Sequence, residues 1–541
     1  MSINIIPLEI LAHIWQMAAK DSSHYQSFRS NFGQDASGVG YDTSHTSWRL
    51  THVCSMWRQC VAGIPLLWNE LSLNIQAYSR IILTNPSIDL NALLISRTRD
   101  VTISAVLYYG DEDSEPQGGD NDANALRDAV LSGWMGTQRC HRLDIYAPAR
   151  VLSRMGHALG ELQNLRALRI ARQECVEGAL LEPGLNAGWL SASSISTLDP
   201  IPDASRYPRL ERFSLLGLPW DVMTVPLSLP HLELTQFYDA EDIADLLYRH
   251  GASLETAAFT LHFETPYDSD DPEDPEDEKA YRGAELVTLP LLRKLCISVT
   301  SDTPISYIYH LKNRLVFPAL THLLIEFDLR SNEDFPEACS LLSALASVFN
   351  SSNCEALQQL SVDFIVDALC HEAMEKTTEG LIMLLATHTN VTHLFVRCRY
   401  DSHLSHLPLL GVIPDAFFER LIFGGLLQTD ADCRDVDVQT GNPNLLPQLT
   451  HLCICGEFPS SKLFWLVTSR TAADPFAPLG LNCLTHIALC QLSVGKEGRE
   501  FAKDLQEAAD RAGCQVWRQA ARQCYGGVSP RMLLSLRRVR R

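Results

Sequence analysis

The sequence lacks any uninterrupted run of about 18 apolar residues, the length that a membrane-spanning helix needs, so no membrane span is expected. Its start also lacks the basic region and apolar core of a secretory signal, because Glu9 and His13 interrupt the apolar stretch there. The 16 cysteines are scattered through apolar runs, as at Cys296 and Cys398, and form no dense framework. They are typical of reduced core thiols. We therefore expect a soluble intracellular protein, cytoplasmic or nuclear.

Basic residues are scarce relative to acidic ones. The chain has 44 Lys and Arg against 65 Asp and Glu, which gives a formal net charge of −21. That charge disfavours general binding to nucleic-acid phosphates. Hydrophobic residues make up 46% of the 541 residues, as in a globular protein large enough for more than one domain.

Motifs of catalysis are missing. Gly495-Lys496 has neither the upstream Gly nor the following Ser or Thr of a phosphate-binding loop. At His371-Glu372, Glu375 stands where a zinc protease needs its second His. No Gly-x-Ser-x-Gly nucleophile turn occurs. We predict that the chain is not an enzyme and uses no cofactor.

Metal-binding patterns are also missing. Cys453 and Cys455 form the closest cysteine pair, but no second pair at matching spacing completes a structural zinc site. The acidic run at residues 264–279 fails the EF-hand pattern of a Gly at position six and a Glu at position twelve. We predict no metal site and a solvated acidic loop.

Apolar residues concentrate near the start of the chain. Between residues 50 and 61 they recur at the spacing of one helical stripe, namely Leu50, Val53, Cys54, Trp57 and Val61. The pattern predicts one helix that Pro65 ends, followed by a second apolar group at residues 66–68. So short a segment cannot bury this much apolar surface alone. The rest of the chain, a partner, or both must cover it.

Three pieces of this region resemble the F-box, in the form found among F-box-like proteins of mushroom-type fungi. They are the start at residues 5–15, IIPLEILAHIW, the Val-Cys-x-x-Trp-Arg segment at residues 53–58, and the Pro-x-Leu-Trp segment at residues 65–68. The resemblance covers roughly residues 3–75. This sequence departs from the family in a polar insertion at residues 20–46, which separates the two apolar halves of the module.

The resemblance implies a three-helix F-box domain that docks on a Skp-type adaptor and so joins a cullin-type ubiquitin ligase. The residues carried over to adaptor docking are Pro7, Leu8, Ile10, Leu11, Val53, Cys54, Trp57 and Trp68. Trp57 and Trp68 have a second interpretation, as internal packing of the helices. For Trp57 the two interpretations are equally favoured, because buried aromatic residues serve both roles.

A loose Leu-x-x-Leu-x-Leu repeat follows. Its copies begin at residues 165, 210, 292, 320, 357, 391, 449 and 484, with weaker copies at 232 and 254. The starts at 210, 232 and 254 lie 22 residues apart, within the range of leucine-rich repeats, and helical patterns at residues 338–349 and 378–387 fill longer intervals. We predict an α/β solenoid arc with a strand and an outer helix per repeat. The alternative is a non-repetitive α/β domain whose strands share a leucine bias.

These patterns divide the chain into four predicted parts. They are the F-box-like domain at residues 1–75, a connecting segment or first irregular repeat at 76–142, the repeat arc at 143–495, and a C-terminal helical cap with a basic tail at 496–541. Irregular leucine-rich repeats commonly follow the N-terminal module in the fungal family that the chain resembles. Solenoids need such polar-faced caps at their ends.

Polar residues lie between the leucines of the repeat. Because side chains alternate across a strand, these residues face the concave, solvent side. We name as candidate substrate contacts His322, Glu326, Asp363, His393, Phe395, Arg397, His451 and His486. The alternative, which we favour, is that half-exposed polar residues are simply tolerated there.

The sequence thus predicts a substrate-recognition adaptor of a cullin-type ubiquitin ligase. Its partners would be a Skp-type adaptor, the cullin complex and an unknown target protein, with no nucleic acid and no membrane. The alternative is a leucine-rich-repeat scaffold without a ligase link, in which the N-terminal helices only cap the first repeat.

Overall fold

The computed structural model divides into two compact units, Met1–Leu234 and Thr235–Arg541. The structure describes residues 10–15, 50–74, 96–98, 100–108, 139–147, 164–172, 207–216, 228–234, 240–261, 286–300, 308, 311–312, 314–329, 335–352, 354–366, 380–400, 409–410, 417–418, 421, 446–455, 460–470, 483–489, 496–511 and 514–518. The predicted polar insertions at 20–46 and 264–279 and the basic tail lie outside these residues.

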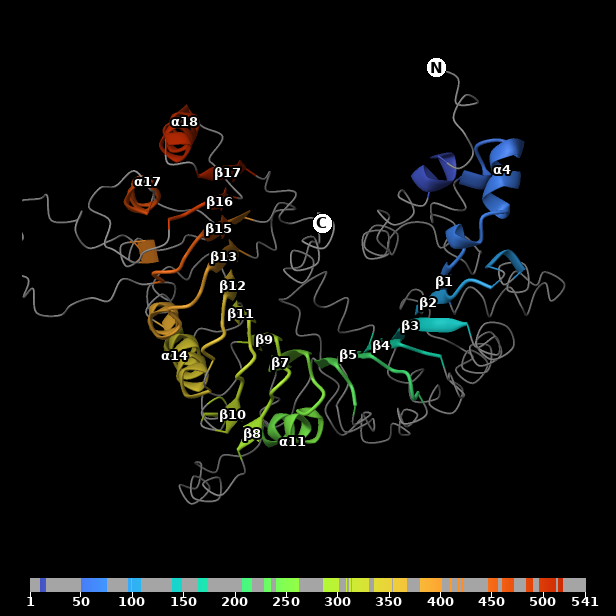
Figure 1. Cartoon of the computed structure of the whole chain (residues 1–541), viewed down its shortest axis with the longest axis horizontal. Coiled ribbons are helices and arrows are strands. Elements are labelled where there is room, and N and C mark those ends of the chain that lie inside the picture. The colour runs from blue at the N-terminus through green and yellow to red at the C-terminus, as the bar shows by residue number, and fades with distance from the viewer. Residues whose placement is uncertain are drawn as a thin grey trace, which may run out of the picture. The chain divides into compact units, whose positions relative to one another are not determined.

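The first unit begins with helices and continues into a parallel sheet. Residues 10–15 are helical, and α4 (Ser55–Ala62) and the short 3₁₀ helix η2 (Pro65–Leu67) lead into the first strand. Each strand pairs in parallel with the next in sequence, as Figure 1 shows. The strands are β1 (Glu70–Asn74), β2 (Ile103–Tyr108), β3 (Cys140–Ala147), β4 (Ala167–Arg172), β5 (Arg212–Leu216) and β6 (His231–Leu234).

The second unit repeats this arrangement with more strands. Neighbours again pair in parallel, without a change of order. The strands are β7 (Thr256–Leu261), β9 (Lys294–Thr300), β11 (His322–Leu329), β12 (Gln359–Val366), β13 (His393–Tyr400), β15 (His451–Cys455), β16 (His486–Leu489) and β17 (Gln515–Arg518). Short β14 (Leu409–Leu410) pairs antiparallel with β13, and β8 (Val287–Thr288) pairs with β10 (Leu315–Val316) apart from this sheet.

Helices connect many strands of the second unit. They are α11 (Ala240–His250), α14 (Phe335–Ser351), a helix at residues 380–387, α17 (Ser460–Ser469) and α18 (Lys496–Arg511). In Figure 1, α14, α17 and α18 lie on one side of the strands that they join. The predicted helices at 338–349 and 378–387 are therefore confirmed, the second from residue 380.

Alternation along each strand explains the core. In β11 the leucine positions Leu323, Ile325 and Phe327 are buried, and Phe327 stacks on Phe364 of β12 with ring centroids 5.5 Å apart. The in-register leucines of neighbouring strands form one continuous apolar face. Full burial of each such side chain contributes about 1.5–3 kcal/mol. The prediction of an α/β protein built from parallel strands is confirmed.

Two local predictions are wrong. The helix expected across residues 50–61 breaks at Cys54, which adopts extended backbone angles before α4 begins. The C-terminal cap expected to be helical throughout contains a strand, β17, which pairs with β16 and extends the sheet. The adjacent residues Val516 and Trp517 favour a strand there, because β-branched and aromatic side chains suit a pleated surface.

Candidate docking surfaces

The break before α4 places a polar cap at the start of that helix. Cys54 is the N-cap residue, and its Sγ accepts a hydrogen bond from the Trp57 backbone N–H at 3.4 Å. The Arg58 Nε donates to the Thr51 carbonyl at 3.1 Å and joins α4 to the preceding helical residues. Cys54 and Arg58 thus have structural roles in the segment that resembles the family motif.

The first helix has an inward and an outward face. Leu11 and Trp15, four residues apart, are buried, whereas Ile10 and Ile14 are exposed by 53% and 42%. Trp15 packs on Trp57 with ring centroids 4.9 Å apart. The half-buried Trp57 therefore contributes to the core of the helical module.

Trp68 joins the helices to the sheet of the first unit. Its indole Nε1 donates to the Val61 carbonyl at 2.8 Å, and the Arg97 guanidinium lies 4.4 Å from the ring centroid. With 2% exposure, Trp68 is part of the core. Its position two residues before β1 fixes the helical module to the start of the sheet.

The predicted adaptor-docking residues therefore divide into two groups. Ile10, Val53 and Cys54 are exposed. Leu11 and Trp68 are buried and offer no surface to a partner, since they complete the core of the chain itself. Pro7 and Leu8 lie outside the described residues.

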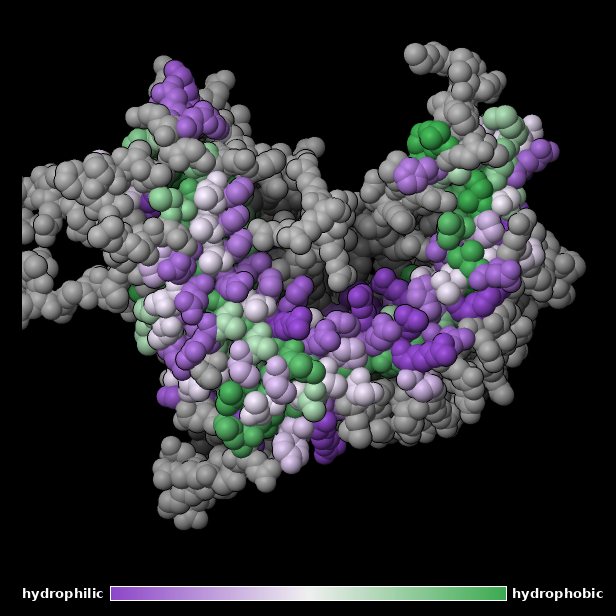
Figure 2. Space-filling model, viewed as in Figure 1, coloured by the Kyte–Doolittle hydropathy of each residue, from purple (hydrophilic) through white to green (hydrophobic). Residues whose placement is uncertain are grey.

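Sequence reasoning did not select three further residues of this surface. Ile14, Met56 and Leu66 are exposed by 42%, 43% and 50%. We define the apolar set as Ile10, Ile14, Val53, Met56 and Leu66. Hydrophobic side chains are visible on these N-terminal helices in Figure 2, while hydrophilic ones gather over β3, β4 and β5.

The strands of each unit carry a second candidate surface, which we call the polar face. It consists of the side chains that alternate with the buried leucine positions. In the first unit these include Arg142, Asp144, Arg169, Ser214 and Glu233. In the second they include the eight residues predicted as substrate contacts.

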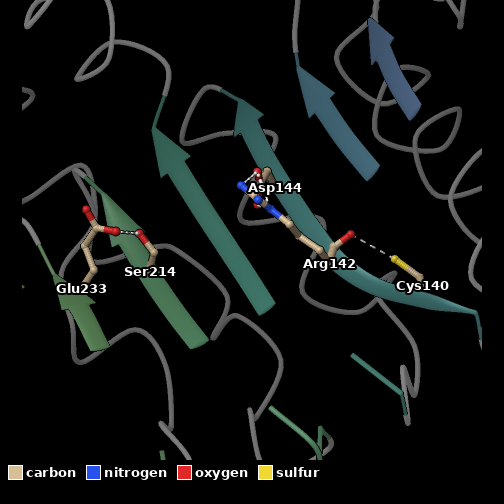
Figure 3. Close-up of polar contacts among 5 residues, drawn as sticks. All are labelled: Cys140, Arg142, Asp144, Ser214 and Glu233. Carbon is tan, nitrogen blue, oxygen red and sulfur yellow. Dashed lines mark hydrogen bonds and ion pairs between the residues drawn. The ribbon is translucent and has the colours of Figure 1, made fainter. Parts of the chain in front are cut away.

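On the polar face of the first unit, polar side chains bind one another (Figure 3). Arg142 Nη2 lies 2.7 Å from an oxygen of the buried Asp144, and its Nε lies 3.2 Å from both oxygens. Ser214 donates to Glu233 at 2.9 Å across the β5–β6 pair. Sequence reasoning missed these residues, although the alternation that selected the second unit's contacts would have found them.

Cys140, at the start of β3, is the thiol closest to these contacts in sequence. Its Sγ donates to the Arg142 carbonyl at 3.4 Å. Burial raises the pKa of the Cys140 thiol to about 12. The protonated thiol is a poor nucleophile and a structural group.

In the second unit, four strands begin with a Thr-His pair, and we call these pairs the Thr-His ladder. Each Thr hydroxyl donates to a carbonyl of a neighbouring repeat at 3.0–3.1 Å. Each Oγ1 also lies 2.7–2.9 Å from Nδ1 of the following His. The ladder comprises Thr321-His322, Thr392-His393, Thr450-His451 and Thr485-His486.

This geometry fixes the position of each imidazole, because every Nδ1 is held within hydrogen-bond distance of a Thr Oγ1. Which of the two atoms donates depends on the ring tautomer. Three of the rings also stack. His393 and His451 have centroids 4.0 Å apart, and His451 and His486 4.3 Å apart, with interplanar angles of 17° and 6°. We call these three residues the histidine column.

The histidine column does not form a metal centre. Nearly parallel ring planes direct the Nε2 atoms of the three rings side by side, whereas metal ligands must converge on one point. Among the described residues, no group of three His, Cys, Asp or Glu side chains has an arrangement that could hold a metal ion.

Two of the predicted substrate contacts are not available on the surface. Asp363 and Arg397 face each other across the β12–β13 register, with Nη1 and Oδ2 3.3 Å apart. Their side chains are only 3% and 16% exposed, so the pair is internal. Glu326 and Phe395 are half-buried, as are the four histidines.

None of the helices in the described part of the chain is both long and apolar enough to span a membrane. No model of a known protein family matches the chain, and a search among curated proteins finds no match.

Proposed function

We propose that the chain is a substrate-recognition adaptor of a cullin-type ubiquitin ligase. In this proposal the N-terminal helices form an F-box that docks on a Skp-type adaptor, and leucine-rich repeats bind the target protein. The observation that supports it is the apolar set. Five large apolar side chains are exposed within residues 10–66, on or beside helices whose residues Leu11, Trp15 and Val61 are buried in the core.

Such exposure favours a partner. Isolated apolar side chains on a surface are ordinary, but a concentration on one small module is typical of an interaction site. Complete burial of an Ile, Val, Leu or Met side chain contributes about 1.5–3 kcal/mol. Ile10, Ile14 and Val53 are already partly buried, so a partner that covered them would gain part of this energy from each, and other contacts would have to offset the rest of the association cost.

The proposed activity is recruitment. The helices would hold the chain on the ligase, and the polar faces of the strands would hold the target. A target lysine would then remain near the charged ubiquitin carrier at a high effective concentration. The second unit's half-buried His322, Glu326 and Phe395 are the candidate target contacts from the predicted set, together with the histidine column.

A scaffold without a ligase link is the second candidate. It is favoured by the contact of Trp68 with Val61 and Arg97, which joins the helices directly to the first strands. A helical module in that place would cap the end of a sheet that is otherwise open to water.

Binding of the full chain to a purified Skp-type adaptor separates the two candidates. Val53→Asp places a charge on the apolar set at a side chain that is 59% exposed, so the fold should tolerate it. The ligase proposal predicts binding by the wild type and a loss of about tenfold or more in Val53→Asp. Leu286→Asp, also at a side chain with 59% exposure but in the second unit, is the matched control and should bind normally.

A folded wild type that does not bind the adaptor would reject the ligase proposal and favour the scaffold. Binding that Val53→Asp retains would show that the adaptor uses another surface, and so would contradict the role of the apolar set.

A further inference from the structure

The histidine column combines three titratable groups in van der Waals contact. His393, His451 and His486 are directly opposite one another in the register of β13, β15 and β16. Their rings stack at 4.0 and 4.3 Å. In the neutral form such contact is favourable packing between flat rings. Histidine is also the side chain that changes charge between about pH 5 and pH 8.

Protonation of neighbouring rings turns this favourable contact into a repulsive one. Two unit charges about 4 Å apart repel by about 1 kcal/mol in water and by about 4 kcal/mol at the effective dielectric near a protein surface. His451 lies between two rings and so experiences both repulsions. The backbone pairing of β13 with β15 and β16 holds the rings together, so relief requires separation of the strands or rotation of a ring.

The neighbouring side chains on this face define the surroundings of the column. Gln359 of β12 is opposite His393, and Gln515 of β17 is opposite His486. Next along the strands lie Phe395, Cys453 and Ala488. The described charged residues further along the polar face of β11, β12 and β13 are Glu326, Asp328, Asp363, Arg397 and Arg399. Gln thus occupies the same row on both sides of the column, which shows that an uncharged amide fits there.

The Thr-His ladder connects the protonation of the histidine column to the hydrogen bonds between repeats. Thr450 donates to the Thr392 carbonyl, and Thr485 donates to the Thr450 carbonyl, both at 3.1 Å. The same hydroxyl oxygens lie 2.8 and 2.9 Å from the Nδ1 atoms of His451 and His486. A ring that turns away to relieve repulsion therefore also loses its bond to the Thr that joins one repeat to the next.

We propose that the histidine column is an acid-sensitive latch, which holds the β13, β15 and β16 repeats together while its rings are neutral and loosens them when they are protonated. A buried histidine in the same region acts in the same direction. His388 precedes β13, is 7% exposed, and has its pKa lowered by burial to about 4. The inference concerns the fold and does not depend on the ligase proposal.

Hydrogen exchange of the full chain, corrected for the intrinsic effect of pH on exchange rates, tests the latch. We expect the β13, β15 and β16 amides to open about tenfold more often at about pH 5.5 than at about pH 7.5, relative to those of β9 and β11. In His451→Gln, which removes both stacked charge pairs, we expect this extra opening to fall to the part that His388 causes, while protection at about pH 7.5 is retained.

His322→Gln is the matched control. His322 has the same bond to its Thr, but its register neighbours are Lys294 and Gln359 instead of histidines. This variant should keep the full response to acid. A second variant, His486→Gln, removes one stacked pair and should reduce the response without abolishing it, which covers the case that His451→Gln does not fold. A wild type that opens equally at both pH values would overturn the latch. An undiminished response in a folded His451→Gln or in His486→Gln would do the same.

Discussion

The polar side chains on the strands of the two units are held by different kinds of contact. In the first unit, charged side chains are used: Arg142 binds the buried Asp144 two residues along the same strand. In the second, neutral Thr-His pairs repeat from strand to strand and donate to the carbonyls of neighbouring repeats. An ion pair within a strand fixes one side chain, whereas the ladder joins one strand to another. Ser214–Glu233 also joins two strands of the first unit and Asp363–Arg397 is a charged pair of the second, so the second unit differs in repeating one neutral link from strand to strand.

The largest loss of stability should come from replacing a buried arginine of the second unit that donates hydrogen bonds to two distant carbonyls. Arg470 is 1% exposed, and its Nε and Nη1 donate to the carbonyls of Leu421 and Leu446 at 2.9 and 2.8 Å. Arg470→Met should lower the free energy of unfolding by about 3 kcal/mol, because two buried carbonyls lose their donors. Hydrogen exchange should show the loss in the second unit and unchanged protection in β3 and β4. A uniform loss in both units would contradict this localisation.

Acid should weaken the second unit through His388. Its pKa is about 4 in the folded chain and about 6.5 when unfolded. The unfolded chain therefore binds a proton first, so stability is complete above about pH 6.5 and falls as pH decreases toward 4. We expect a loss of about 2 kcal/mol from this residue between about pH 6.5 and pH 5. Urea unfolding of wild type and His388→Leu at both pH values measures it, and an equal slope in the two proteins would reject the assignment.

A smaller effect should come from the charged pair of the first unit. The Arg142 side chain is 53% exposed and that of Asp144 7%, so water screens the contact in part. Asp144→Asn should destabilise β3 and β4 by about 1 kcal/mol. Added salt should narrow the difference between wild type and variant, because exposed charges are screened. Thermal unfolding at low and high salt checks this, and an effect that does not depend on salt would indicate that packing dominates.

A change to the Thr-His ladder should lower the stability by a similar amount, but this loss should not depend on salt. Thr450→Val keeps the shape of the side chain and removes its bonds to the Thr392 carbonyl and to His451. We expect a loss of about 1–2 kcal/mol in the second unit. Parallel salt titrations of Thr450→Val and Asp144→Asn would sharpen the comparison of the two polar faces. The comparison would fail if both variants responded to salt alike.

The repeat pattern predicted most of the strands because burial of every second side chain is a local requirement. Leu165, Leu168 and Ile170, for instance, are buried in and beside β4. The same rule could not find β17, whose apolar residues are Val516 and Trp517 and not leucines. Nor could helical spacing detect the break at Cys54, because positions i, i+3 and i+4 keep their apolar character across a turn.

The candidate sites were harder to predict from the sequence than the strands were. They depend on which residues the pairing of strands brings together, and the residue pattern of a single strand does not show this. Alternation placed Asp363 and Arg397 on the polar face, but only the register puts them opposite each other, and that contact removes them from the surface. Register also brings the three histidines into one stack from strands far apart in sequence. In the N-terminal module, the sequence could not decide which of Ile10 and Leu11 is buried.

The most direct measurement of the central claim is a hydrogen-exchange footprint of the full chain with and without a purified Skp-type adaptor. Our account predicts increased protection at residues 10–15 and 53–66, where the apolar set lies. The strands of both units should keep their exchange rates. Protection confined to the polar faces, or no change at any saturating adaptor concentration, would contradict the proposal that these helices dock on the adaptor.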